Sequence, residues 1–139
     1  PSIIDKKIKE AARLAHIADF VETLPEKYET TLGERGVLLS AGQRQRIALA
    51  RVLARKPEIL ILDEATSALD NESELKIQEA IDGLKGEITI LVIAHRLSTI
   101  MRSDRVLTLE NGEITGQKSP EEFLKDKNSY FFKAYHIRA

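Results

Sequence analysis

Cysteine and tryptophan are absent from this 139-residue sequence, and so is any long hydrophobic run. Without cysteine the chain has neither a disulfide framework nor a thiolate metal site, which is compatible with a reducing compartment. No apolar run approaches the ~18 residues that a membrane-spanning helix needs. We therefore expect any role at a membrane to come through a partner.

An excess of charge of one sign is also missing. The formal net charge is −1, because 21 basic residues are balanced by 22 acidic ones. On these grounds neither nucleic acid nor an anionic membrane is expected as a partner. The chain instead has 31% charged and 42% hydrophobic residues, a globular composition with a well-solvated surface and the length of one domain.

A polar helix start lies at residues 39–43, which read LSAGQ. Ser40 and Gln43 have the S-x-x-Q form of a capping box, so we expect a helix to begin there. It should end near Arg55, because Pro57 disfavours helical geometry in the residue before it. Free N–H groups and the positive pole of the helix dipole coincide at the start of this helix, and together they attract phosphate.

An apolar strand with two acids at its end follows. Residues 59–62 are apolar on both faces, which is typical of a strand covered on both sides in a parallel sheet. Asp63 and Glu64 stand at its carboxyl end, the edge at which open α/β sheets bind ligands. A second apolar strand is expected over residues 89–94, directly before His95. A phosphate-binding helix start next to a metal-binding carboxylate and a candidate base indicates nucleotide hydrolysis.

Each of these features also has a purely structural interpretation. Ser40 alone is more often a helix cap than a phosphate ligand, and His95 alone is more often structural than catalytic. Asp63 and Glu64 fit ordinary acids at a strand end, and Asp70 fits a helix cap as well as a functional loop. Most of the arginines after the helix start are expected on a solvated face: Arg44, Arg46, Arg51 and Arg55.

The motifs together closely resemble those of the ATP-binding cassette (ABC) family of transport ATPases. Residues 39–43 resemble the family's signature motif, usually written LSGGQ, and residues 59–63 resemble Walker B. Glu64 resembles the catalytic glutamate, residues 67–70 resemble the D-loop, and His95 resembles the switch histidine. All of them occur in the family's order and spacing, which is far more specific than any one motif.

The resemblance implies a role for each of these residues. Asp63 would hold Mg²⁺, Glu64 would polarise the attacking water, and His95 would contact the γ-phosphate of ATP. Asp70 would couple the two ATP sites that a head-to-tail dimer of nucleotide-binding domains shares. The signature residues that would close over the ATP of the opposite subunit are Ser40, Ala41, Gly42 and Gln43.

The sequence departs from the family pattern in two ways. No G-x-x-x-x-G-K-[ST] motif occurs, so the glycine-rich phosphate loop and its lysine are absent from these residues. Ala41 replaces the first glycine of the signature, and we expect it to be accepted because a residue at a helix start has negative φ. We interpret the chain as the second half of a cassette and expect that by itself it hydrolyses no ATP.

The fold implied by the resemblance is α/β, the second half of a P-loop NTPase-like (RecA-like) ABC ATPase domain with a parallel sheet at its core. Residues 1–56 would belong to the helical signature subdomain. Residues 57–139 would form the C-terminal part of the RecA-like core with its terminal helices. A C-terminal β-hairpin is expected around the turn at Asn111-Gly112.

Periodicity predicts most of the remaining elements. An amphipathic helix is expected over residues 4–22, and another should begin at Asp70 or Asn71. The apolar stripe of this second helix consists of Ile77, Ala80, Ile81 and Leu84. Further helices are expected at residues 97–102, from Ser119 onward and at 129–139.

The function implied by the resemblance is ATP hydrolysis coupled to transport by an ABC exporter. Residues 33–36, together with LSAGQRQRIALAR and DEATSALD, look most like exporters with fused membrane domains. The partners would be a second nucleotide-binding domain and transmembrane domains, at the cytoplasmic face of the cell membrane. Two alternatives stay open. One is an ABC ATPase without transport, and the other is a non-catalytic module that donates its signature helix to another cassette.

Overall fold

The computed structural model describes residues 3–33, 38–63, 69–93 and 96–127. Two compact units make up the chain, residues 1–92 and residues 93–139. The first unit holds most of the helices and a pair of strands, and the second holds a β-hairpin with short helices. The boundary predicted after residue 56 is a different one: it would separate two subdomains of the family fold, and it stays a prediction.

The N-terminal segment forms two helices where periodicity predicts a single helix over residues 4–22. α1 (Ile3–Leu14) ends in a turn, and α2 (Ala18–Glu22) follows it. His16 has a φ of 52°, and the N–H of Ile17 bonds back into the last turn of α1, as in a Schellman motif. A histidine stands where such a turn usually has glycine, which is why the sequence carries no clear stop signal.

A 3₁₀ turn, η1 (Lys27–Glu29), precedes the helix that carries the signature-like residues. This helix, α3 (Ala41–Leu53), begins as predicted, with Ser40 as the N-cap of a complete capping box. It ends close to the predicted position, ahead of Pro57. Its start is therefore set by local side-chain chemistry that can be read from the sequence.

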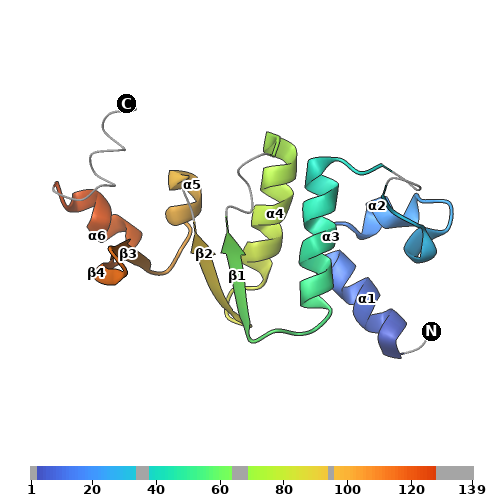
Figure 1. Ribbon diagram of the computed structural model, residues 1–139, viewed down its shortest axis with the longest axis horizontal. Helices are drawn as coiled ribbons and strands as arrows, with labels where there is room; N and C mark the ends of the chain where they lie inside the picture. Colours follow the sequence, from blue (N-terminus) through green and yellow to red (C-terminus); the bar gives the residue numbers. More distant parts are fainter. Residues whose placement is uncertain (1–2, 34–37, 64–68, 94–95, 128–139) are drawn as a thin grey trace. The chain divides into compact units, whose positions relative to one another are not determined.

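A strand, a helix and a second strand follow as β1 (Ile59–Asp63), α4 (Asn71–Gly83) and β2 (Thr89–Ile93). The two strands pair and run in the same direction, so the predicted parallel βαβ unit is confirmed (Figure 1). The N–H of Thr89 donates to the C=O of Glu58 at 3.0 Å where the pair begins. The carboxyl ends of both strands therefore lie at the same edge.

Helices α3 and α4 lie side by side and run in the same direction, opposite to β1 (Figure 1). An apolar core joins them to α1 and to the strands. All four members of the predicted apolar stripe of α4 are buried. The buried members of this core are Ala11, Ala12, Ala15, Ile17, Val21, Leu49, Leu53, Leu60, Ala80 and Leu84.

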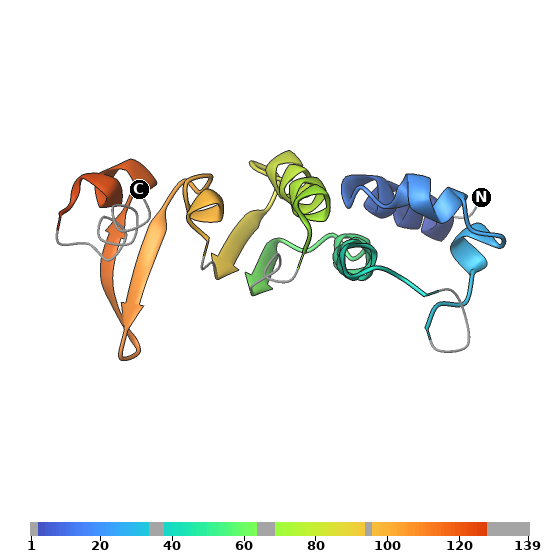
Figure 2. The same cartoon turned by 90° about the horizontal axis from the view of Figure 1, so that it is seen from above.

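Among the residues that the structure describes, nothing covers one face of the strand pair, which contradicts the prediction that residues 59–62 are covered on both sides. Leu60 is buried, but the alternate residues Ile59 and Ile61 are 63% and 62% exposed. Successive side chains of a strand point to opposite faces. Figure 2 shows α4 on one side of the pair and no described helix of this unit on the other. An apolar strand sequence indicates suitability for burial and does not reveal what covers each face.

The β-hairpin of the second unit has the predicted turn. β3 (Val106–Glu110) pairs antiparallel with β4 (Glu113–Lys118), and Leu109 lies opposite Ile114. The two turn residues at positions 111 and 112 have φ values of 51° and 83°. Positive φ at both positions is what a type I′ turn requires, and Asn-Gly is the dipeptide that supplies it most readily.

Two short helices flank this hairpin along the chain. α5 (Leu97–Ile100) precedes it, and α6 (Pro120–Lys125) follows it, with Ser119 and Glu122 forming the capping box of α6. The helix predicted over residues 129–139 lies outside the described residues. Within the described part of the chain, no helix is both long enough and apolar enough to span a bilayer.

The buried stripe of α4 makes a testable statement about stability. Ile77 is 2% exposed, so Ile77→Ala should lower the free energy of unfolding by about 2–5 kcal/mol, through lost burial and the cavity that remains. Leu75 on the same helix is 51% exposed, so Leu75→Ala should change the free energy of unfolding by only about 0.5 kcal/mol. Urea unfolding measures both values, and equal losses would contradict the packing described for α4.

Candidate functional site

The start of α3 is held by two reciprocal hydrogen bonds. The N–H of Gln43 donates to Oγ of Ser40 at 3.1 Å, and the N–H of Ser40 donates to Oε1 of Gln43 at 2.9 Å. The structural interpretation of Ser40 as a helix cap is therefore confirmed. Both side chains are engaged with the helix backbone, which fixes the first turn in place for any further role.

Two backbone donors remain at this helix start. The N–H groups of Ala41 and Gly42, in the first turn, have no hydrogen-bond partner among the residues that the structure describes. Orphan N–H groups at the positive end of a thirteen-residue helix suit a phosphate group. Ala41 is helical, so its φ is negative, and the expectation that alanine is tolerated at this position is confirmed for the backbone.

Asp70 is the N-cap of α4. Its Oδ1 accepts a hydrogen bond from the N–H of Ser73 at 2.9 Å. Hydrogen bonds from the backbone and side chain of Ser73 hold the pKa of Asp70 below the ordinary value of an aspartate. The start of α4 lies beside the start of α3, because Gly42 packs against Ser73. The structure therefore brings two of the predicted site segments together, around Gly42 and Asp70.

Asp63 occupies the predicted position at the carboxyl end of β1. It is the last residue of the strand, and it is exposed. One exposed carboxylate suits Mg²⁺, which uses few protein ligands and keeps waters and substrate phosphates in its shell. Among the described residues no group of three or more His, Cys, Asp or Glu side chains is arranged to hold a metal ion.

Glu64 and His95 lie outside the described residues. β1 ends directly before Glu64, and β2 ends at Ile93, two residues before His95. Because the strands are parallel, β1 and β2 end at the same edge of the sheet. That the two side chains meet Asp63 there stays a prediction.

Arg46 does not lie on the solvated face expected for most arginines of α3. Its side chain is buried, with Nη1 donating to the C=O of His16 at 2.7 Å and Nε donating to the C=O of Gly42 at 3.3 Å. It lies on the same face of α3 as the buried residues Leu49 and Leu53. This helical spacing is the sequence signal that identifies Arg46 as a packing residue.

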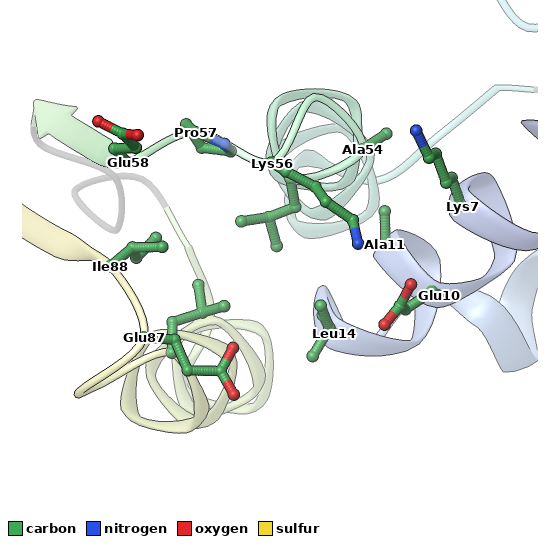
Figure 3. A pocket seen from close by; sticks show the side chains of 12 residues that line it. Lys7, Glu10, Ala11, Leu14, Ala54, Lys56, Pro57, Glu58, Glu87 and Ile88 are labelled. Atoms are coloured by element: carbon green, nitrogen blue, oxygen red, sulfur yellow. The ribbon is translucent and has the colours of Figure 1, made fainter.

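A pocket of about 370 Å³ opens at the other ends of α3 and α4 (Figure 3). Leu53 and Leu84 contribute to its apolar lining, near the last turns of the two helices. Charged side chains on its rim include Lys56, Glu58 and Glu87. The pocket is therefore separate from the candidate site, which lies where the two helices begin.

Comparison with known proteins shows what this chain is similar to. A family model described as ABC transporter matches residues 3–67. The Mus musculus protein named ATP-binding cassette sub-family B member 5 is 54% identical over 126 residues, covering 91% of this chain. A Staphylococcus aureus protein that carries the name multidrug export ATP-binding/permease protein is 48% identical over 130 residues, covering 94% of this chain.

A solved structure agrees with the sequence relatives. The structure of a bacterial Atm1-family ABC exporter with ATP bound superposes with a TM-score of 0.81 at 40% identity, over 96% of this chain. The chain spans only part of each relative: 10% of the mouse protein, 22% of the staphylococcal protein and 23% of the exporter chain. The similarity therefore concerns one segment of much longer proteins.

The cap of α4 predicts an effect of pH on stability. A carboxylate whose pKa is lowered by folding stabilises the fold above its unfolded pKa, and this stabilisation is lost as the pH falls through the folded value. Thermal unfolding of the native protein should therefore show this loss as the pH falls below about 4.

Asp70→Asn is the matched control, because asparagine also caps helices but does not titrate. Near neutral pH its unfolding temperature should stay close to that of the native protein. Its decline on acidification should be shallower. Identical acid profiles for the two proteins would show that Asp70 makes no such contribution.

Proposed function

This chain belongs to the ABC transporter ATP-binding cassettes of exporter type, as part of their nucleotide-binding domain, and we propose that the complete protein hydrolyses ATP to drive transport. One observation carries the proposal. Over 96% of its length the chain superposes on an ABC exporter with bound ATP, and this likeness supports a phosphate at the capped start of α3, where two N–H groups have no partner among the described residues.

The proposed chemistry uses three residues at the carboxyl edge of the strands. Asp63 would hold Mg²⁺, which when bound would supply positive charge for the phosphates of ATP. Glu64 orients and polarises the attacking water. His95 contacts the γ-phosphate. A glutamate of ordinary pKa is a weak base, so positioning and charge stabilisation supply most of the acceleration.

The proposed partner across the site is a second nucleotide-binding domain. In a head-to-tail dimer, the start of α3 closes over the ATP that is bound to the other domain. The N–H groups of Ala41 and Gly42 and the polar side chains of Ser40 and Gln43 face this nucleotide. Asp70, at the start of the neighbouring helix, lies where it can couple the two shared sites.

Transmembrane domains are the proposed second kind of partner. The name of the staphylococcal relative joins ATP-binding and permease functions in one protein, and the solved relative is an exporter. We infer that this chain works at the cytoplasmic face of a membrane as part of such an exporter. ATP-driven closure of the nucleotide-binding domains would then drive the conformational change of the transmembrane domains.

Glu64→Gln in the complete protein tests the proposed chemistry. Hydrolysis should fall by about 10²–10⁴-fold, because the amide does not polarise water as a carboxylate does. ATP binding should persist, since the amide keeps the size of the side chain. Glu58→Gln, at the other end of β1, is the control and should leave hydrolysis unchanged. Full hydrolysis by the Glu64→Gln protein would refute the catalytic role of this glutamate.

The 139 residues by themselves should neither bind Mg-ATP tightly nor hydrolyse it. The reason is that the sequence holds no glycine-rich phosphate loop and no lysine of the P-loop type. Isothermal titration calorimetry with Mg-ATP measures this directly. Tight, stoichiometric binding would show that the residues described above make a complete ATP site without a P-loop.

A further inference from the structure

The first turns of α3 and α4 meet with no space for a side chain between them. A Cβ atom placed on Gly42 would lie 2.5 Å from Cβ of Ser73 and even nearer to its Oγ. Real Cβ atoms essentially never approach other heavy atoms below 3.0 Å. Both residues are buried, so neither helix start can take up a larger side chain without moving. Ser73 therefore leaves no room for a side chain at position 42.

Ser73 also holds the residue that begins its own helix. Its N–H donates to Oδ1 of Asp70 at 2.9 Å. One residue thus contacts both neighbouring segments: its side chain lies against Gly42, and its backbone and side chain are both hydrogen-bonded to Asp70. A chain of direct contacts runs from Gly42 through Ser73 to Asp70.

Gly42 is held from the side of α3 as well. The guanidinium of Arg46 donates to the C=O of Gly42 at 3.3 Å and to the C=O of His16 at 2.7 Å. The hydrogen bond to Gly42 is buried and the one to His16 is partly buried, so the loss of the bond to Gly42 would leave a polar group without a partner away from water. The first turn of α3 is therefore fixed between the α1–α2 turn and Ser73.

We propose that Ser73 is a positioning residue, which sets the distance between the signature segment at Gly42 and the D-loop residue Asp70. This inference rests on the proposed function, because the two segments matter together only if both face nucleotide in a dimer. The contact makes the two helix starts move as one piece. An ATP that binds the start of α3 then also fixes the position of Asp70.

The test is a set of paired substitutions in the complete protein. Gly42→Ala should reduce ATP hydrolysis about 10-fold or more, because the added methyl group pushes the two helix starts apart. The ATP affinity of the separated nucleotide-binding domains, measured with a fluorescent ATP analogue, should stay unchanged. ATP-driven dimerisation should weaken in parallel with hydrolysis.

The second substitution decides between two reasons for the glycine. Ser73→Gly removes both Oγ and Cβ, so Gly42→Ala with Ser73→Gly should recover hydrolysis and dimerisation to near the level of Ser73→Gly alone. Ser73→Ala keeps the Cβ that would lie 2.5 Å from the new methyl group, so it should not restore them. If neither change restores them, the glycine is required by the nucleotide and the proposal is wrong.

Thermal unfolding of the same variants separates this inference from the proposed function. The Gly42→Ala protein should unfold at a lower temperature, and Ser73→Gly, but not Ser73→Ala, should reverse the added loss. An unsubstituted protein without ATP hydrolysis would refute the proposed function and the positioning role that rests on it. An active protein in which Ser73→Gly gives no recovery in hydrolysis or unfolding temperature would refute the Gly42–Ser73 contact alone.

Discussion

Side-chain capping decides where the two helices of the candidate site begin, and the rest of the site depends on those two points. Ser40 and Gln43 fix the first turn of α3, and Asp70 fixes the first turn of α4. A helix without such caps frays at its end, where four N–H groups lack partners. Because both starts are fixed, the close contact between Gly42 and Ser73 keeps one geometry. The N–H groups of Ala41 and Gly42, which have no hydrogen-bond partner among the described residues, are held in a fixed position as a result.

The elements that could be predicted from the sequence are those set by local chemistry. The capping boxes of α3 and α6, the turn at residues 111–112 and the buried stripe of α4 all depend on residues within one or two turns of each other. The break at His16 has the hydrogen bonds of a glycine turn without the glycine, so it has no local signal. The exposure of Ile59 and Ile61 is decided by which elements pack on each face, which composition does not encode.

The candidate site shows the same division. Motif spacing identifies Asp63, Ser40 and Asp70 as candidates, and the structure places each at the end of its predicted element. Contacts between residues far apart in sequence, such as Gly42 with Ser73 and Arg46 with the carbonyl of His16, depend on how α3 packs. A sequence motif does not predict such contacts. It specifies residue types, whereas the tertiary fold determines the distances between them.

Parallel alignment of α3 and α4 gives the first unit an electric polarity. Two side-by-side helices of the same direction place like partial charges next to each other, which is less favourable than an antiparallel pair. Two features offset this repulsion. Apolar residues are buried between the helices, and the carboxylate of Asp70 lies at the positive end of α4. The combined field fades within about 8 Å at physiological ionic strength, so an anion is attracted only on close approach. Added salt should then weaken this attraction while leaving the packing of the two helices intact.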